Sequence, residues 1–302
     1  MKGIVLPGIA PSSYQEVEFF INNDSFAIQR FKEASEVLGY SLASAFREAD
    51  ETNQEVYEVC FLANTLALLD HFYKRYNYQP DFTIGVSFGG MSAAVQTNTL
   101  TYAEAVWLTH EAAKKSKEFF KQMKEDYQTH FIYNMSLDEA KTIIRQFQEE
   151  GMYLELVGFL KKVVCLCGNA QTIKLLKEKI NTIPKISSLH TMNQPIHSVL
   201  LKDLKVQLEH ELFNQIKFKP MKTSIISDVN GEIITDSELF KQSLLDGYDN
   251  PVRWDLVTDT MKKQEVSQAF VIGPRNLFAQ LLKQDFNIVR ISPDEIENIA
   301  TL

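Results

Sequence analysis

The chain has 302 residues, 45% hydrophobic and 23% charged, which is the composition of a globular protein with a large core. It carries 31 Lys and Arg against 39 Asp and Glu, a formal net charge of −8. This balance argues against a nucleic-acid or anionic-membrane partner, because both need a basic face. The N-terminus lacks a signal-peptide pattern, and no apolar run reaches the length of a membrane span. We therefore expect a cytoplasmic protein.

Three cysteines, an odd number, cannot all pair in disulfides, and we interpret them as reduced core thiols (Cys60, Cys165 and Cys167). No cluster of His, Asp, Glu and Cys has the spacing of metal ligands, so we expect neither a metal nor a bound cofactor.

Strand and helix patterns alternate over the first 125 residues. A short apolar strand ends at Pro7-Gly8, a turn dipeptide. Apolar residues at helical spacing then predict a long helix, followed by a second strand and two further helices. The expected elements are strand 3–6, helix 56–76, strand 82–85, helix 91–96 and helix 102–120.

The pattern changes between residues 126 and 194, where the order strand–helix–strand–strand–helix–strand is that of a ferredoxin-like unit. Its expected elements are strand 129–133, helix 137–149, strand 153–156, strand 162–167, helix 171–180 and strand 186–189. After Pro195 the α/β alternation resumes, with helix 198–213, strand 224–226, helix 237–245, a helix from 255, strand 269–272 and helix 277–282. Such alternation predicts an α/β fold with a parallel sheet. We expect a large subdomain of 1–125 and 195–302, with 126–194 inserted as a small one.

Gly85-Val86-Ser87-Phe88-Gly89 is a G-x-S-x-G motif between an expected strand and an expected helix. A sharp turn at this place needs small neighbours and presents the serine hydroxyl at the end of the sheet. The N–H groups that follow lie at a helix N-terminus, which favours a developing oxyanion. The motif indicates that Ser87 is a nucleophile; otherwise it would merely cap the next helix.

A nucleophilic serine needs a base, and the chain has six histidines. His71, His110 and His210 fall within helix patterns, whereas His130 and His190 belong to the inserted unit. His197 follows Pro195 where the insertion returns to the main domain, and sites concentrate at such junctions. His197 is therefore the candidate base, with a helix-capping or exposed imidazole as the alternative.

Six motifs in order resemble the malonyl-CoA:acyl-carrier-protein transacylases and the acyltransferase domains of polyketide synthases. They span nearly the whole chain: Val5–Gly8 (V-F-P-G), Gly85–Gly90 (G-H-S-x-G-E), Pro195–Leu201 (the histidine segment), Ser227–Gly231 (S-N-V-D/T-G), Asn250–Trp254 (N-P-V-R-W) and Val271–Pro274 (V-G-P). The resemblance implies an α/β-hydrolase-like core with a ferredoxin-like insertion.

The resemblance also implies the roles of the site residues. Ser87 would accept an acyl group from one thioester and pass it to another, with His197 as its base. A backbone carbonyl at Asn250 would orient the histidine, and the backbone N–H groups of Ile9 and Phe88 would form the oxyanion hole.

Departures from the family pattern bear on the substrate. Malonyl-using members carry an arginine about 25 residues after the serine, which binds the malonyl carboxylate. A gapless count from Ser87 places Ala112 there, followed by Lys114 and Lys115. A lysine lacks the fork geometry of arginine, so we expect Ala112 to open the acyl pocket to a neutral acyl group.

Our main prediction is a serine acyl-enzyme with a Ser-His dyad that acts on acyl-carrier-protein thioesters in polyketide biosynthesis. The resemblance is greatest to the discrete acyl hydrolases that lack the arginine, which makes the protein a proofreading hydrolase or a non-malonyl acyltransferase. One alternative is a malonyl transacylase that uses another basic group such as Lys115. Another is an inactive scaffold that docks carrier proteins.

The expected partner is the acyl carrier protein of a polyketide synthase, which supplies the substrate on its phosphopantetheine arm; CoA is the other carrier. An acidic carrier protein needs a basic docking patch on this acidic chain. The candidates are Lys114, Lys115, Lys117, Lys161 and Lys162. We expect the protein itself to be a monomer.

Overall fold

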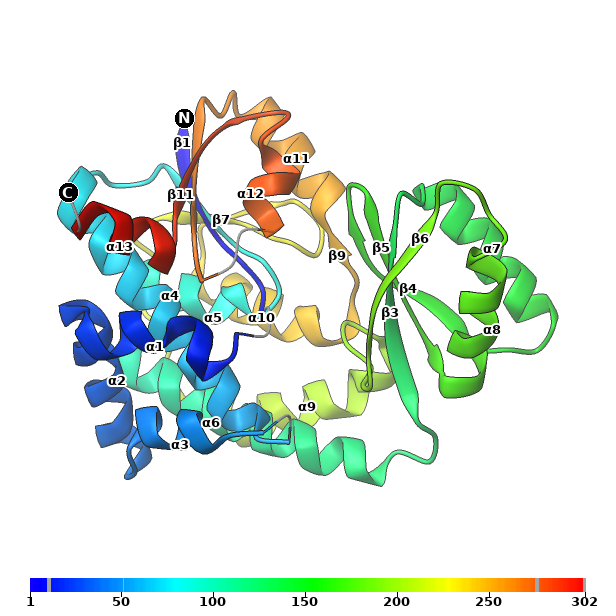
Figure 1. The fold of residues 1–302 in the computed structure, drawn as a ribbon, viewed down its shortest axis with the longest axis horizontal. Helices are drawn as coiled ribbons and strands as arrows, with labels where there is room; N and C mark the ends of the chain where they lie inside the picture. The colour runs from blue at the N-terminus through cyan, green and yellow to red at the C-terminus, as the bar shows by residue number, and fades with distance from the viewer. Residues whose placement is uncertain (10–11, 51, 275–276, 301–302) are drawn as a thin grey trace.

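The computed structural model describes residues 1–9, 12–50, 52–274 and 277–300, and it has a larger and a smaller part (Figure 1). The larger part contains a six-stranded sheet of order β11–β10–β1–β2–β7–β8. Its strands are parallel except for the antiparallel pair β7 and β8. Their bounds are β1 (Lys2–Leu6), β2 (Phe82–Gly85), β7 (Ser224–Ile226), β8 (Ile233–Ile234), β10 (Gln268–Ile272) and β11 (Asn287–Ile291). The expected α/β fold class is confirmed.

Both faces of this sheet are buried, since side chains alternate across a strand. Ile4 and Leu6 of β1 pack into the core formed with α4, α5 and α6, whereas Val5 packs on the opposite face with α11 and α12. The helices are α1 (Tyr14–Asn23), α2 (Ser25–Leu38), α3 (Leu42–Glu48), α4 (Gln54–Tyr76), α5 (Gly89–Gln96), α6 (Tyr102–Gln122), α11 (Trp254–Lys263), α12 (Leu277–Leu282) and α13 (Pro293–Ala300).

Helices α1 to α3 fill a stretch for which the sequence pattern predicted no element. Asp24 ends α1 and begins α2 at once, because its carboxylate accepts the N–H groups of Phe26 and Ala27. The helices are therefore separated by single residues or short turns, which blurs their apolar periodicity.

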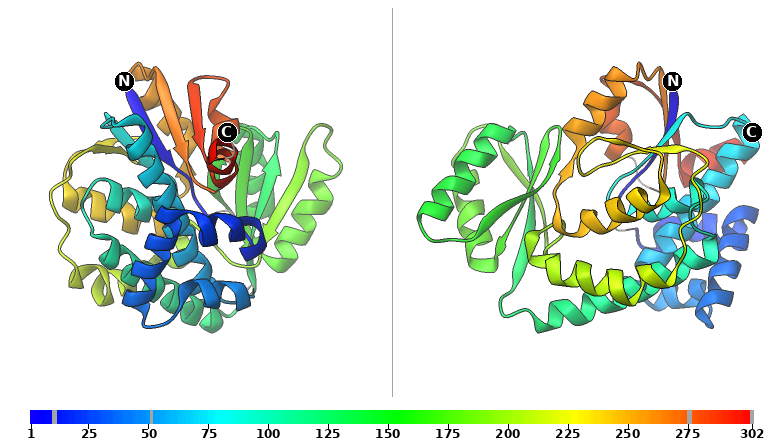
Figure 2. Two further views of the ribbon diagram at one scale, coloured as in Figure 1. Left: turned by 60° about the vertical axis from the view of Figure 1, so that its left-hand side comes forward. Right: turned by 180° about the vertical axis from the view of Figure 1, so that it is seen from behind.

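The smaller part has the ferredoxin-like order β6–β3–β5–β4, with antiparallel pairs throughout. Its elements are β3 (Tyr127–Tyr133), α7 (Leu137–Glu149), β4 (Leu154–Leu160), β5 (Val163–Asn169), α8 (Ala170–Ile180) and β6 (Ser187–Met192). A fifth strand, β9 (Val252–Arg253), pairs with β4 in parallel and comes from the other part of the chain. Figure 2 shows the smaller part standing to one side of the larger one. The division at residues 126 and 194 remains our prediction.

The segment after the insertion is less regular than expected. In place of one helix over 198–213, the structure has a 3-10 turn (Val199–Leu201), α9 (Lys202–Glu211) and a second 3-10 turn (Phe213–Gln215). Helix α10 (Ser237–Asp249) packs against α9. None of the described helices is both long and apolar enough to cross a bilayer.

Trp254 anchors this arrangement, since it begins α11 directly after β9. Its side chain is 0% exposed and contacts the Phe278 ring edge-on at 5.0 Å between centroids. We expect Trp254→Ala to lower the free energy of unfolding by about 3–5 kcal/mol, because it leaves a large cavity. The control Leu239→Ala removes a side chain that is 61% exposed and should cost less than about 0.5 kcal/mol. Denaturant unfolding of both variants measures this, and similar losses would contradict it.

Candidate active site

Three neighbouring parallel strands end at the same edge of the large sheet. Ile9 follows β1, Ser87 follows β2 and Asp228 follows β7, and β2 pairs with both of the other strands. Ligand sites in open α/β sheets lie at the carboxyl ends of the strands. The strand order therefore brings these three residues together.

Ser87 lies on a strained turn with φ of 52°, a left-handed conformation that is rare for serine. The turn packs too closely for side chains at its flanking glycines. A Cβ at Gly85 would lie 2.6 Å from the Gly89 carbonyl oxygen, and one at Gly89 would lie 2.1 Å from the Leu6 carbonyl oxygen. The Ser87 N–H donates to Asp228 Oδ2 at 2.6 Å, which ties the turn to the loop after β7.

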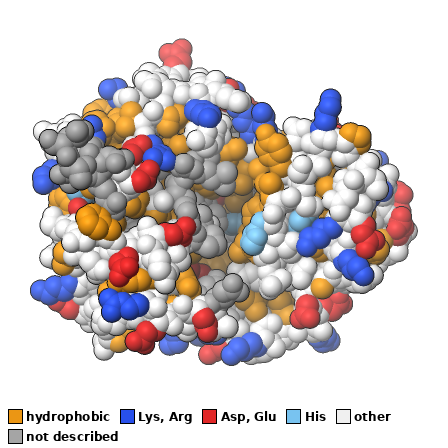
Figure 3. All heavy atoms as spheres, viewed as in Figure 1, with side chains coloured by type: hydrophobic (Ala, Val, Ile, Leu, Met, Phe, Trp, Pro, Cys, Tyr) orange, Lys and Arg blue, Asp and Glu red, His pale blue; other side chains and the backbone are white. Residues whose placement is uncertain are grey.

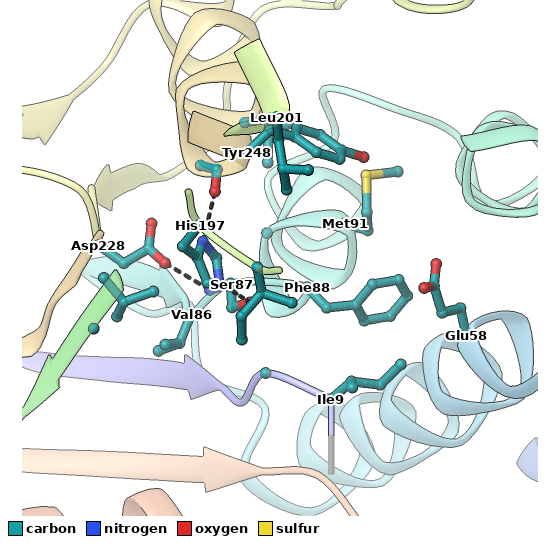
Figure 4. Close-up of a pocket in the computed structure, with 18 of the residues that line it drawn as sticks. Ile9, Glu58, Val86, Ser87, Phe88, Met91, His197, Leu201, Asp228 and Tyr248 are labelled. Atoms are coloured by element: carbon teal, nitrogen blue, oxygen red, sulfur yellow. Dashed lines mark hydrogen bonds between the residues drawn. The ribbon is translucent and has the colours of Figure 1, made fainter. Parts of the chain in front are cut away.

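The structure brings Ser87 and His197 together, 110 residues apart in sequence. Ser87 Oγ lies 2.7 Å from His197 Nε2, and His197 Nδ1 lies 2.5 Å from the backbone carbonyl oxygen of Gly247 (Figure 4). A carbonyl oxygen only accepts, so Nδ1 carries the proton. In the neutral imidazole Nε2 is then free to accept the Ser87 hydroxyl proton.

The carbonyl that orients His197 was expected at Asn250, and this was wrong by three residues. Helix α10 continues to Asp249, so the Gly247 carbonyl lies in its last turn. In a continuous helix the N–H of residue 251 would donate to the Gly247 carbonyl. Residue 251 is a proline and has no N–H. The Asn250 N–H bonds the carbonyl of Asp246 instead. The unpaired Gly247 carbonyl is thus available to the histidine.

Ser198 fixes the segment next to His197 from two sides. Its N–H donates to the carbonyl of Tyr248 in α10 at 3.1 Å, and its hydroxyl donates to Glu155 in β4. His197 itself has φ of 52°. The position of the imidazole therefore depends on contacts with both parts of the molecule.

Burial alters two titratable groups in the site. It lowers the pKa of His197 below its ordinary value, an effect that the bond to Gly247 opposes. Burial raises the pKa of Asp228 to about 6, against the effect of the Ser87 N–H that it accepts. At neutral pH His197 is thus in the neutral form that a base needs.

The backbone N–H groups expected to form the oxyanion hole lie beside Ser87. Phe88 begins the turn into α5, and Ile9 lies on the wall of the same cavity. Among the described residues, no acceptor bonds the N–H of either residue. Both donors are therefore available to a bound oxygen, and their role remains a prediction.

A cavity of about 310 Å³ extends from Ser87 and His197 between the two parts of the molecule. Its lining is mostly apolar, and Figure 3 shows hydrophobic side chains along the boundary where the parts meet. Ala112 lies on its wall, 7% exposed. The described lining contains two carboxylates, Glu58 and Asp228, and no Lys or Arg.

The two lysines near Ala112 do not line this cavity. Lys114 pairs with Glu111 at 3.2 Å on the surface of α6, and Lys115 pairs with Glu211 at the end of α9. Across the described residues, no group of three His, Cys, Asp or Glu side chains has the geometry of a metal site.

Three residues of the site had no role in the sequence analysis: Glu58, Asp228 and Gly247. Asp228 gave a signal, since it stands where the S-N-V motif has Asn. Gly247 could have been found from the proline four residues after it. Glu58 gave no signal, because a glutamate near the start of a helix is usually solvated.

The close approach at Gly89 yields a test of the turn. We expect Gly89→Ala to lower the free energy of unfolding by about 1–3 kcal/mol, because the new methyl group forces β1 and α5 apart. Gly247→Ala is the control: its Cβ would meet nothing within 4 Å, and alanine favours a helix by up to about 1 kcal/mol. Thermal or denaturant unfolding distinguishes them, and equal stability of the two variants would refute the packing argument.

Comparison with known proteins finds related chains, although no family model matches. The chain is 26% identical over 262 residues to the malonyl CoA-acyl carrier protein transacylase of Bacillus subtilis, covering 84% of this chain and 80% of that one. FabD from Acinetobacter baumannii superposes with a TM-score of 0.86 at 19% identity, over 99% of this chain and 96% of that one. A malonyl-transacylase in complex with its type II PKS acyl-carrier protein gives 0.84 at 21% identity, over 96% of each chain. The chain therefore has the fold of the malonyl-CoA:acyl-carrier-protein transacylases.

Proposed function

We propose that this protein is an acyltransferase that carries an acyl group on Ser87 between two thioesters, with an acyl carrier protein as one partner. The observation that carries the proposal is the 2.7 Å contact between Ser87 Oγ and His197 Nε2 at the cavity. The names of the relatives support the carrier protein and the transfer reaction. CoA or the partner's phosphopantetheine supplies the thioester, so the reaction needs no bound cofactor.

In the proposed mechanism His197 Nε2 takes the hydroxyl proton of Ser87 as Oγ attacks the thioester carbonyl carbon. The carbonyl oxygen becomes an oxyanion, which the N–H groups of Ile9 and Phe88 stabilise. The C–S bond then breaks, and the departing sulfur takes the proton from His197. A second thiol attacks the ester by the same steps in reverse. The Gly247 carbonyl keeps the proton on Nδ1 throughout.

The identity of the acyl group is the point on which the comparisons and the pocket differ. The relatives are named malonyl transacylases, which supports the alternative that we kept open rather than a hydrolase or a non-malonyl enzyme. The pocket offers malonyl no cation: its described lining has no Lys or Arg, and Lys115 pairs with Glu211. A buried carboxylate without a partner costs several kcal/mol. Malonyl is thus the first candidate by relationship, and an acyl group without a carboxylate is the candidate that the lining favours.

The comparisons give no support to a hydrolase, and a polyketide context remains a prediction. The lysines considered for carrier docking are mostly paired within the chain: Lys117 donates to the Thr52 carbonyl at 2.6 Å, and Lys161 pairs with Asp285 at 2.6 Å. Such surface pairs are weak and can exchange partners. They stay candidates for docking.

Covalent labelling tests the acyl-enzyme. We expect wild type to gain one acyl group on Ser87 when it is incubated with acyl thioesters, and Ser87→Ala to gain none. His197→Ala should label at least about 10²-fold more slowly, because general base catalysis typically contributes this much. Intact-protein mass spectrometry and peptide mapping measure both. Labelling of the Ser87→Ala variant at the wild-type rate would exclude the proposal.

The Ala112→Arg variant tests the acyl group. If this position faces the acyl group, the guanidinium supplies the missing cation and also removes volume. We expect it to raise malonyl labelling and to lower labelling by acetyl and longer neutral donors. Ala112→Met adds similar bulk without charge and should lower labelling by all donors alike. Wild-type labelling that is faster with malonyl than with acetyl would establish the malonyl alternative.

A further inference from the structure

Glu58 is a carboxylate on the wall of the acyl cavity that the proposed reaction does not use. It lies in α4, one turn after Gln54, and both residues line the cavity. Gln54 Nε2 donates to Glu58 Oε1 at 2.6 Å. Among the described residues, no donor bonds Oε2. One oxygen is therefore held by the protein, and the other is available to a ligand.

The surroundings of Glu58 leave its negative charge uncompensated. Burial raises the pKa of Glu58 to about 7, against the bond from Gln54, and the nearby Glu55 raises it further. No described Lys or Arg lines the cavity, and the second carboxylate there, Asp228, already accepts the Ser87 N–H. A cationic group in the cavity would favour the ionised form of Glu58, whereas an anionic group beside it would be repelled by that form.

The cavity connects Glu58 with the nucleophile. In Figure 4 the Phe88 ring extends from beside Ser87 toward Glu58, and Met91 lies on the same side of the pocket. The Tyr248 hydroxyl has no partner among the described residues, and Glu58 contributes to raising the pKa of this tyrosine. An acyl chain on Ser87 that follows this wall thus reaches a carboxylate and a neutral hydroxyl, which together can accept the N–H donors of an ammonium group.

We propose that the acyl group carried by this protein bears an amino group, and that its ammonium form binds Glu58 in the cavity. The inference rests on the proposed acyl transfer at Ser87 and adds the substrate class. The described lining contains no Lys or Arg to hold malonyl, and it contains a carboxylate, Glu58, with one oxygen that a plain alkyl chain would leave without a donor. An aminoacyl chain satisfies this anion.

The experiment compares donors that differ only by an amino group in place of a methyl group. Labelling of Ser87 is measured with 3-aminobutanoyl- against 3-methylbutanoyl-CoA and with 6-aminohexanoyl- against heptanoyl-CoA, so that two chain lengths are sampled. We expect kcat/KM in the wild type to favour the amino donor of at least one pair by about tenfold or more. In Glu58→Gln, which keeps the shape and removes the charge, the ratio of labelling by the amino donor to labelling by the alkyl donor should fall to about one.

Glu55→Gln is the matched control, since Glu55 lies one turn away on α4 and outside the cavity lining. The preference should survive in this variant. If the alkyl donors label the wild type and neither pair shows a preference for the amino donor, the aminoacyl inference is wrong. The proposed acyl transfer at Ser87 would still hold in that case. A preference that persists in Glu58→Gln also overturns the aminoacyl inference. If no thioester labels Ser87, the proposed function itself fails, so the two failures are distinguishable. Should Glu58→Gln not fold, the wild-type comparison still decides.

Discussion

The site depends on one main-chain approach, in which the turn after β2 lies against the end of β1 with only glycine between them. Gly85 and Gly89 leave no room for a Cβ, and the chain must therefore turn sharply at Ser87 with a left-handed backbone. This turn directs the hydroxyl toward His197 and leaves the Phe88 N–H at the start of α5. Backbone strain of this kind persists only where the surrounding structure enforces it. Here the parallel strands and the Asp228 carboxylate enforce it.

The electrostatics of the cavity set this chain apart from the pattern expected for a malonyl enzyme. The wall that would need a cation contains Ala112, and the neighbouring wall contributes Glu58. Both features act in the same direction, since Ala112 offers an anion no partner and the charge of Glu58 repels one. The proposed acyl transfer at Ser87 uses no side chain of this wall, so the same reaction centre is compatible with a different acyl group.

Much of this arrangement was predictable from the sequence, because local patterns determine it. The strand–turn–helix around Ser87 predicted the nucleophile's position, and the junction after Pro195 predicted that of His197. The carbonyl that orients the histidine was placed at Asn250 because a motif position was carried over, whereas the end of α10 and Pro251 decide which carbonyl is free.

Other features depend on contacts that no local pattern contains. Helices α1 to α3 are separated by turns too short to interrupt the apolar pattern clearly. The Lys115 side chain was considered as a substrate ligand, but its partner Glu211 lies 96 residues later. Glu58 resembles any solvated helix residue until the cavity is assembled around it.

The anchoring of Ser198 links the two parts of the molecule next to the reaction centre. Its hydroxyl donates to Glu155 in β4, and its N–H donates to the Tyr248 carbonyl in α10, directly beside His197. The chain segment that carries the imidazole is therefore held by β4 and by α10 at once. The distance between His197 and Ser87 is thus set where the two parts meet, and a substitution in either part can alter it.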